Sequence, residues 1–562
     1  MSHLVFAALA LCVVSANSKN VIEMSMLDNT KDDPALLNIP KQFSFAAYYG
    51  DHMVLQKAPQ QAVIWGYNPL SNVFIDVSVA QQKVRALVGT NGQWSVTLDP
   101  VKGPGPYNVT ARGPEGEITL TDVLFGDVWL CSGQSNMQFS VSQVFNASEE
   151  IKDADNYPNI RLFTVNQVTS KVPLTDLDAP KSIKQPWSVA SRKAVDGGAW
   201  GYFSAVCWLY GKYLYQKLGY PIGLVNTCWG GTPVEAWSSP DALAKCGLDS
   251  ETIASDLMME PFYGRISPDG NFGGPQNSMV LWNAMIHPLL DMTIYGAIWY
   301  QGENNAHLNR HLYNCTFPSM ISDWRVKFHA SHGQNDPTFP FGFVMLGANT
   351  PNMSDFDGFP EIRWHQTADF GFVPNKKMEN VFMANAMDLP DFLSPFGPIH
   401  PRDKQGIARR LVNASLAVAY HHTDIPYQAP LPSGFKVNTA ASTLEIIFSN
   451  GTETLELRNN VGFEVCCSYG SEGVCDSRAW WLQAPIVRKT ESSVIITTAS
   501  CEPQNVAGTR YAWRLSPCTF MDCSVYSLHS SLPASPFQFT AAEFHKDGSY
   551  YVDKDIPYPL EG

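Results

Sequence analysis

The chain of 562 residues lacks several features that would assign it to a common functional class. It has no run of lysine or arginine, and its formal net charge is −14, so neither a nucleic acid nor an anionic membrane surface is the expected partner. Beyond the first residues, no apolar stretch is long enough to span a membrane. There is no internal repeat or low-complexity segment. With 45% apolar residues, this composition predicts a globular protein with several hydrophobic cores.

The common signatures of metal and nucleotide sites are absent as well. Neither an H-E-x-x-H motif nor a P-loop occurs, and the cysteine spacings do not match a zinc site. The motifs therefore predict no metal site.

The N-terminus predicts entry into the secretory pathway. Residues 1–16 form a short apolar run that ends in small residues, which is typical of a cleaved signal peptide, although no lysine or arginine precedes the run. Destinations in the lysosome or outside the cell both remain open. Six N-glycosylation sequons support this route. Their asparagines are Asn108, Asn146, Asn314, Asn352, Asn413 and Asn450.

Twelve cysteines fit an oxidising compartment. Cys12 would leave with the signal peptide, and six others cluster late in the chain, which predicts a disulfide-stapled C-terminal module. The five that remain are an odd number, so at least one thiol should be free. We expect it to be Cys131, which lies in an apolar strand-like segment.

The pattern of apolar residues divides the mature chain into three parts. Short β-type runs between Gly, Pro and Asn predict a small β domain over 17–120, and a C-terminal β-sandwich with the cysteine cluster over 428–562. Between them, at 121–427, near-continuous apolar runs alternate with helical patterns such as 205–218 and 404–419. This middle part is predicted to be a three-layer α/β/α domain, with its site at the carboxyl ends of the strands.

The most informative stretch is Gly126–Gln138, an apolar strand that runs into a tight turn at Ser135. A serine at the start of a helix has free backbone N–H groups nearby, which suit a nucleophile with a developing oxyanion. Met137 replaces the second glycine of the G-x-S-x-G elbow, so an ordinary α/β-hydrolase is disfavoured. The alternative is that Ser135 is a simple helix cap.

Three further loops carry residues that acyl transfer requires. Gly230 and Gly231 can turn backbone N–H groups toward a ligand, and Gln301 follows a buried strand. His400 precedes the last helix of the middle part and offers a base. His287 and His365 are rival bases, but both lie in helical patterns and are expected to be structural.

In this order the four loops resemble the SGNH-type carbohydrate esterases, and more closely the animal sialate O-acetylesterase family. The resemblance extends over most of the mature chain. It rests on Gly133–Met137, Trp229–Trp237, Gln301–Glu303 and Ile399–Lys404, and on the flanking stretches Gly50–Gln56 and Leu532–Phe537.

This resemblance implies a fold and a mechanism. Ser135 would be the nucleophile and His400 the general base, and the oxyanion hole would be formed by the Ser135 N–H, a Gly230 or Gly231 N–H and the Gln301 amide. The reaction would remove O-acetyl groups from sialic acids, with 9-O-acetyl preferred, through an acetyl-enzyme and without a cofactor or metal. An acetylesterase for other glycans such as xylan, a catalytically dead glycan-binding protein and a GDSL-like lipase are the alternatives.

One position departs from the family pattern. Many relatives place an aspartate two or three residues before the histidine, where this chain has Pro398 and Gly397. Asp391, or else Asp388, is expected to orient His400, unless a Ser-His dyad operates.

Recognition of a sialic acid carboxylate would require an arginine, because a guanidinium can bind a carboxylate with two N–H groups. Arg265, Arg363 and Arg402 are the candidates in or near loops.

Overall fold

A computed structural model describes residues 42–248, 273–356, 358–468, 475, 480–502, 504–540, 548–552 and 554–555. The predicted signal peptide at 1–16 lies outside these ranges.

The longest strand, β8 (Gly116–Gly133), connects two parts of the molecule. Its first half pairs antiparallel with β7 of the N-terminal part, and its second half pairs parallel with β11 and β12 in the central sheet. The predicted domain boundary at residue 120 falls inside this strand. The two parts therefore share one continuous strand, and β8 ends directly before Ser135.

The N-terminal part consists of strands around the first half of β8. One sheet has the order β1-β3-β6, while β4 pairs with β5 and β7. The strands are β1 (Ser44–Phe45), β2 (Val54–Gln56), β3 (Val63–Tyr67), β4 (Phe74–Val79), β5 (Gln82–Leu87), β6 (Gln93–Thr97) and β7 (Tyr107–Gly113).

The central sheet has the order β10-β9-β11-β8-β12-β13-β14 and is parallel except for β10 at one edge. Strands β11 and β12 flank β8 on opposite sides, so the chain changes direction across the sheet here, at the point where α/β proteins bind ligands. The strands are β9 (Ile160–Val165), β10 (Ile183–Val189), β11 (Ile222–Cys228), β12 (Gly296–Tyr300), β13 (Phe341–Met345) and β14 (Val381–Asn385).

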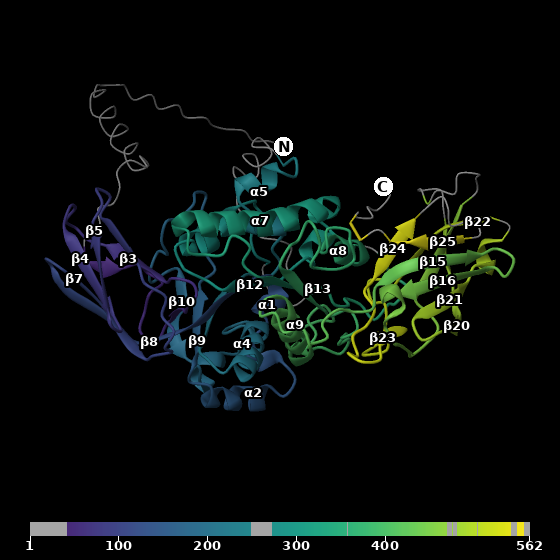
Figure 1. Cartoon of the computed structure of the whole chain (residues 1–562), viewed down its shortest axis with the longest axis horizontal. Helices are drawn as coiled ribbons and strands as arrows, with labels where there is room; N and C mark the ends of the chain where they lie inside the picture. The colour runs from purple at the N-terminus through teal and green to yellow at the C-terminus, as the bar shows by residue number, and fades with distance from the viewer. Residues whose placement is uncertain are drawn as a thin grey trace, which may run out of the picture.

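Helices cover both faces of this sheet, as predicted (Figure 1). On one face Tyr210 of α4 packs against Trp129 of β8, and on the other Phe317 of α7 stacks on Trp299 of β12. The helices are α1 (Ser135–Gln138), α2 (Ala147–Asp153), α3 (Arg192–Val195), α4 (Ala205–Leu218), α5 (Pro240–Ala244), α7 (Tyr313–His332), α8 (Phe359–His365) and α9 (Lys404–Val418). The predicted helices at 205–218 and 404–419 are thus confirmed.

The C-terminal part is built from antiparallel strands around its own hydrophobic core. One sheet has the order β20-β21-β16-β15-β25 and another the order β19-β18-β22-β24. The strands are β15 (Pro432–Asn438), β16 (Thr443–Phe448), β17 (Leu455–Leu457), β18 (Phe463–Ser468), β19 (Trp480–Gln483), β20 (Ile486–Lys489), β21 (Ser493–Thr497), β22 (Asn505–Tyr511), β23 (Val525–Ser527), β24 (Phe537–Thr540) and β25 (Gly548–Tyr551).

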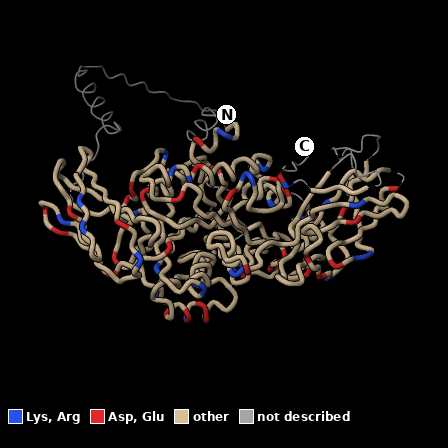
Figure 2. Tube along the Cα trace, viewed as in Figure 1, with Lys and Arg blue, Asp and Glu red and all other residues tan. Residues whose placement is uncertain are grey.

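Figure 2 shows acidic and basic residues interspersed along the trace in all three parts. Among the described residues, no helix is both long enough and apolar enough to cross a membrane.

The disulfides correct one prediction. Cys131 is not free, because its side chain points from β8 toward α4 and is bonded to Cys207. Among the described cysteines, the free thiol is the buried Cys228 at the end of β11, and burial raises its pKa to about 12. The late cluster forms three disulfides, as a stapled module should. The remaining pairs are Cys246–Cys315, Cys466–Cys475, Cys467–Cys501 and Cys518–Cys523.

We predict that peptide mapping of the unreduced protein recovers Cys131 linked to Cys207, and that alkylation labels Cys228 only after unfolding. Replacing Cys131 and Cys207 by Ala together should lower the free energy of unfolding by about 2–4 kcal/mol, because the unfolded chain loses a long closed loop. Cys228→Ala is the control and should change it far less. An alkylated Cys131 peptide from the unfolded, unreduced protein would contradict this pairing.

Candidate active site

Ser135 is the first residue of α1, at the carboxyl end of β8. The turn into α1 requires a glycine at position 133. Gly133 has a φ of 139°, and a Cβ added to it would lie 2.2 Å from the Tyr300 carbonyl oxygen. The next residue, Gln134, donates its backbone N–H to that same oxygen at 2.9 Å. These contacts bind the serine turn to the end of β12.

His400 faces Ser135, with 2.9 Å between the imidazole Nε2 and the serine Oγ. The other ring nitrogen, Nδ1, lies 2.7 Å from the backbone carbonyl oxygen of Phe396. Because a carbonyl can only accept, Nδ1 carries the proton and Nε2 accepts from the Ser135 hydroxyl. This tautomer can take the serine proton.

Aromatic side chains enclose the imidazole, a feature that the sequence analysis missed. The Trp200 ring lies edge-on to the His400 ring at 4.9 Å, and Phe139 stacks on it at 6.4 Å. Trp200 also contacts Phe396 and has a φ of 59°, which is unusual for a bulky residue. The histidine is 8% exposed, so its ring is held by packing as well as by hydrogen bonds.

The predicted orienting acids bind arginines. Asp391 accepts from the Nε and Nη2 atoms of Arg402 at 2.5 and 3.0 Å. Burial alone would raise the pKa of Asp391, but the bonds from Arg402 outweigh it and lower that pKa. Asp388 lies in the loop after β14, where it accepts from Arg410 and from the Tyr526 hydroxyl. The acceptor at His400 Nδ1 is a backbone carbonyl, which corrects the expectation of an aspartate there.

Gln301 does not serve as an oxyanion donor in this structure. Its side chain is fully buried, and Nε2 donates to the Thr232 carbonyl at 3.1 Å and to Asn305 Oδ1 at 2.7 Å. Its Oε1 accepts from the Tyr313 hydroxyl. Both amide hydrogens are therefore used by the loops after β11 and β12, and donation to an oxyanion would break a buried bond.

Two backbone donors remain beside Ser135. The N–H groups of Met137 and Gln138 donate to the Gln134 carbonyl, whereas the Ser135 N–H has no acceptor among the described residues. Gly230 lies against Ser135, since an added Cβ would be 3.1 Å from the serine Cβ. Its N–H donates at 2.7 Å to Gln138 Oε1, an acceptor that an ester carbonyl would have to displace.

A buried network links the serine turn to the histidine loop. The Asn136 amide donates to Glu303 Oε1 at 2.6 Å and to the Ile399 carbonyl at 2.9 Å. Lys404 Nζ donates to Asn136 Oδ1 at 2.6 Å. Asn136 follows Ser135 and Ile399 precedes His400, so this network sets the separation of the two side chains.

The network is buried, because all three side chains are at most 5% exposed. Burial raises the pKa of the Glu303 carboxyl and lowers that of Lys404 to about 7. The Lys404 ammonium also lies over the rings of Phe139 and Tyr300, at 4.7 and 5.2 Å. Asn136, Glu303 and Lys404 lay in the motifs found in the sequence, but no spacing rule connects them to one another.

Of the two candidate arginines that the structure describes, Arg402 lies near the site and Arg363 does not. The Arg402 side chain is 27% exposed, is paired with Asp391 and lies over the Phe145 ring. Arg363 is fully buried and donates to four backbone carbonyls, so it is structural, which corrects its proposed role. Arg265 lies outside the described residues.

The rival histidines are structural, as expected. His287 Nδ1 is bonded to the Leu174 carbonyl, and His365 in α8 is bonded to the buried Asp369. Within the described ranges, no group of three His, Cys, Asp or Glu side chains could hold a metal ion.

Five of the six sequon asparagines are exposed. Asn314 is the exception, because it is half-buried and its amide donates to Asp369 at 2.5 Å.

We predict that Lys404→Met lowers kcat about tenfold to a hundredfold with little change in KM, because a small displacement of Ser135 from His400 is costly for the chemical step. Initial rates of acetate release from an acetyl ester test this. The matched control is Lys212→Met, which removes another buried, paired lysine from α4, away from the site. Equal losses of kcat in both variants would refute a positioning role.

Comparisons with known proteins identify the family of this chain. A family model described as "Carbohydrate esterase, sialic acid-specific acetylesterase" matches residues 125–392, and one for the "Sialate O-acetylesterase C-terminal domain" matches 433–541. The sialate O-acetylesterase of Mus musculus is 44% identical over 522 residues, covering 88% of this chain and 94% of its own. That of Homo sapiens is 44% identical over 506 residues, covering 88% and 92%.

A solved structure shares the arrangement. The carbohydrate acetylesterase of Xanthomonas citri matches with a TM-score of 0.69 and 26% identity, over 88% of this chain and 99% of its own. With relatives of this identity and coverage, the chain belongs to the sialate O-acetylesterase family of carbohydrate esterases.

Proposed function

We propose that this esterase removes O-acetyl groups from sialic acids, with 9-O-acetyl preferred, through an acetyl-enzyme on Ser135. The observation that carries the proposal is the 2.9 Å contact between Ser135 Oγ and His400 Nε2, with the imidazole in the tautomer of a general base. The two curated relatives, both named sialate O-acetylesterase, support the substrate class.

The reaction begins when Ser135 Oγ attacks the acetyl carbonyl carbon and His400 Nε2 takes the hydroxyl proton. The oxyanion accepts from the N–H groups of Ser135 and Gly230, after the side-chain oxygen of Gln138 has moved away from the Gly230 N–H. Each such donor contributes about 3 kcal/mol of transition-state stabilisation. The bond to the sugar oxygen then breaks, and His400 returns its proton to the departing hydroxyl. Water, deprotonated by His400, hydrolyses the acetyl-serine and releases acetate.

We propose that Ser135 and His400 act as a dyad. In a triad, the aspartate holds the histidine tautomer and orientation. Here the Phe396 carbonyl supports the same tautomer, while Trp200 and Phe139 support the ring orientation.

Arg402 is the proposed ligand of the substrate carboxylate. Its Nε and Nη2 bind Asp391, which leaves the Nη1 hydrogens of a partly exposed guanidinium, two residues from His400. The Asp391 pair would hold that guanidinium in place.

We also propose that the protein enters the secretory pathway. The apolar N-terminus and the exposed sequons support passage through the secretory pathway, with the lysosome and the cell exterior as the two destinations.

The first test measures acetate release from 9-O-acetylated sialic acid and from acetylated xylo-oligomers, for the parent protein and for Ser135→Ala. We expect turnover of the sialic acid ester and a loss of at least about 10³-fold in the variant, because its nucleophile is missing. Turnover of the xylo-oligomers alone would mean that the substrate is another acetylated glycan and not a sialic acid. The similarity to the carbohydrate acetylesterase of Xanthomonas citri makes such a glycan the next candidate. No turnover of either would refute the esterase site.

A second test compares the two aspartates. Asp391→Asn should lower kcat less than about tenfold, well short of the roughly 10⁴-fold loss when a triad aspartate is replaced. Asp388→Asn should act on stability, because it leaves Arg410 buried without its counter-ion. A loss near 10⁴-fold in either variant, at a temperature where it is folded, would show that an acid orients His400.

Substrate recognition has its own test. Arg402→Ala should raise KM for sialic acid esters by about tenfold or more, because it removes a charge-assisted contact to the carboxylate, and should leave KM for an uncharged acetyl ester unchanged. An equal change of KM for both substrates would rule out carboxylate recognition by Arg402.

A further inference from the structure

A cavity of about 410 Å³ lies between the central sheet and the C-terminal part. Its walls are formed by β14, one face of α9, the segment 426–429 and two loops of the C-terminal part. It contains neither Ser135 nor His400, so it is separate from the active site. Its volume is in the range of pockets that hold small ligands.

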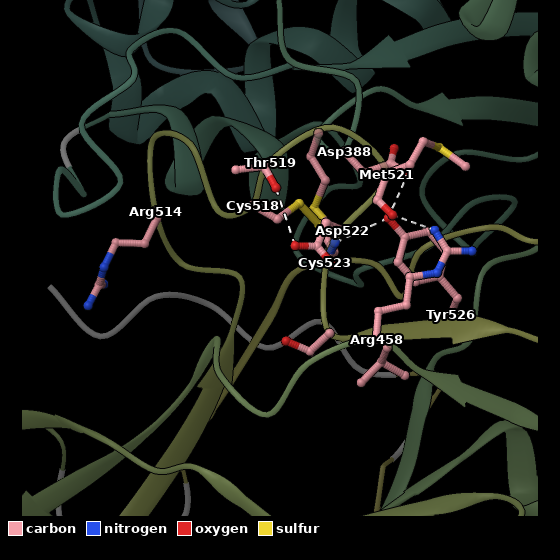
Figure 3. The surroundings of a disulfide bond; sticks show 12 residues. Asp388, Arg458, Arg514, Cys518, Thr519, Met521, Asp522, Cys523 and Tyr526 are labelled. Atoms are coloured by element: carbon pink, nitrogen blue, oxygen red, sulfur yellow. Dashed lines mark hydrogen bonds between the residues drawn. A yellow bond between two sulfur atoms is a disulfide. The ribbon is translucent and has the colours of Figure 1, made fainter. Parts of the chain in front are cut away.

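One wall is a loop closed by the Cys518–Cys523 disulfide (Figure 3). The Met521 N–H donates to the Asp388 carbonyl at 2.8 Å, and Arg458 donates to the Met521 carbonyl. The loop is thereby fixed to the catalytic part on one side and to the C-terminal sheet on the other. It presents Phe520 at the cavity with 54% of that residue exposed.

The opposite wall is a stripe of α9. Asp403, Gly406, Arg409, Arg410 and Asn413 line the cavity at helical spacing, which makes a groove about 15 Å long at 1.5 Å per residue. Asn413 ends this stripe and is the first residue of the sequon Asn413-Ala-Ser. It is exposed, and its amide has no hydrogen-bond partner among the described residues. The sequon therefore opens directly onto the cavity.

Two aromatic side chains of the lining suit a sugar. Phe520 and the half-buried Tyr427 line the cavity, and an aromatic ring can pack against the C–H face of a pyranose.

We propose that this cavity holds the first sugars of an N-linked glycan on Asn413, with N-acetylglucosamine against Phe520 and Tyr427. The attached glycan is favoured over a free oligosaccharide because the covalent link holds its first rings at the cavity at a high effective concentration. The bound sugars would join α9 to the C-terminal part. This inference is independent of the chemistry at Ser135.

Attachment has a defined chemistry. The Asn413 amide nitrogen loses a proton as it forms a bond to C1 of the first sugar, and the diphosphate of a lipid-linked oligosaccharide leaves. Ser415 of the sequon is fully buried and its hydroxyl donates to the Val412 carbonyl. Attachment therefore precedes the folding of α9.

The test uses the full chain secreted from animal cells. Glycopeptide mass spectrometry gives occupancy at Asn413, and peptide-N-glycosidase is applied to folded and to unfolded protein. We expect Asn413 to be occupied, and its glycan to be released about tenfold more slowly from the folded protein than from the unfolded one. The occupied sites among Asn352 and Asn450, which lie outside the cavity, should show a smaller difference. An unmodified Asn413, or equal release from folded and unfolded protein, would overturn the proposal.

A variant separates cavity contacts from general crowding. Phe520→Ala should leave occupancy unchanged and remove most of the protection, since it deletes one wall without touching the sequon. Phe74→Ala, which removes an exposed aromatic side chain from the N-terminal part, is the control and should preserve protection. Undiminished protection in Phe520→Ala would contradict the assignment of this cavity.

Discussion

The proposed chemistry of this molecule depends on one hydrogen bond between residues 265 positions apart, Ser135 and His400. Ser135 follows β8 at the centre of the sheet, and His400 follows β14 at its edge, so β12 and β13 lie between the strands that carry them. The distance is bridged by the long loop after β14 and by Asn136, which accepts from Lys404 and donates to the carbonyl of Ile399. The carboxyl ends of parallel strands meet along one edge of the sheet, and the buried network sets the separation of the two side chains.

Much of this arrangement was legible in the sequence. The apolar runs that became β11, β12, β13 and β14 are nearly continuous, as strands covered on both faces require. Helix α4 ends before Gly219, as predicted. Ser135 and His400 were singled out because each follows or precedes an element with a strong pattern, and the structure brings the two side chains together. A local signal was therefore sufficient for the elements and for choosing these two candidates.

The errors concern side chains whose partners come from elsewhere in the fold. Gln301 was expected to face the oxyanion, but its amide donates to Thr232 in the loop after β11 and to Asn305 in its own loop. Cys131 was expected to be free, but α4 covers its strand and brings Cys207 to it. Asp391 was expected to hold the imidazole, but its carboxylate is paired with Arg402. No spacing in one sequence reveals which of several polar groups a buried side chain will meet, because register and helix placement decide it.

The central proposal is that His400, whose Nδ1 donates to a backbone carbonyl, activates Ser135 without Asp388 or Asp391. The most direct measurement is covalent labelling with an alkyl phosphonofluoridate, followed by peptide mass spectrometry. Our account predicts a single phosphonylated residue, Ser135, at a rate that falls by orders of magnitude in His400→Ala and is nearly unchanged when Asp388 and Asp391 are both replaced by Asn. A label on another serine, or a labelling rate at Ser135 that does not depend on His400, would contradict it.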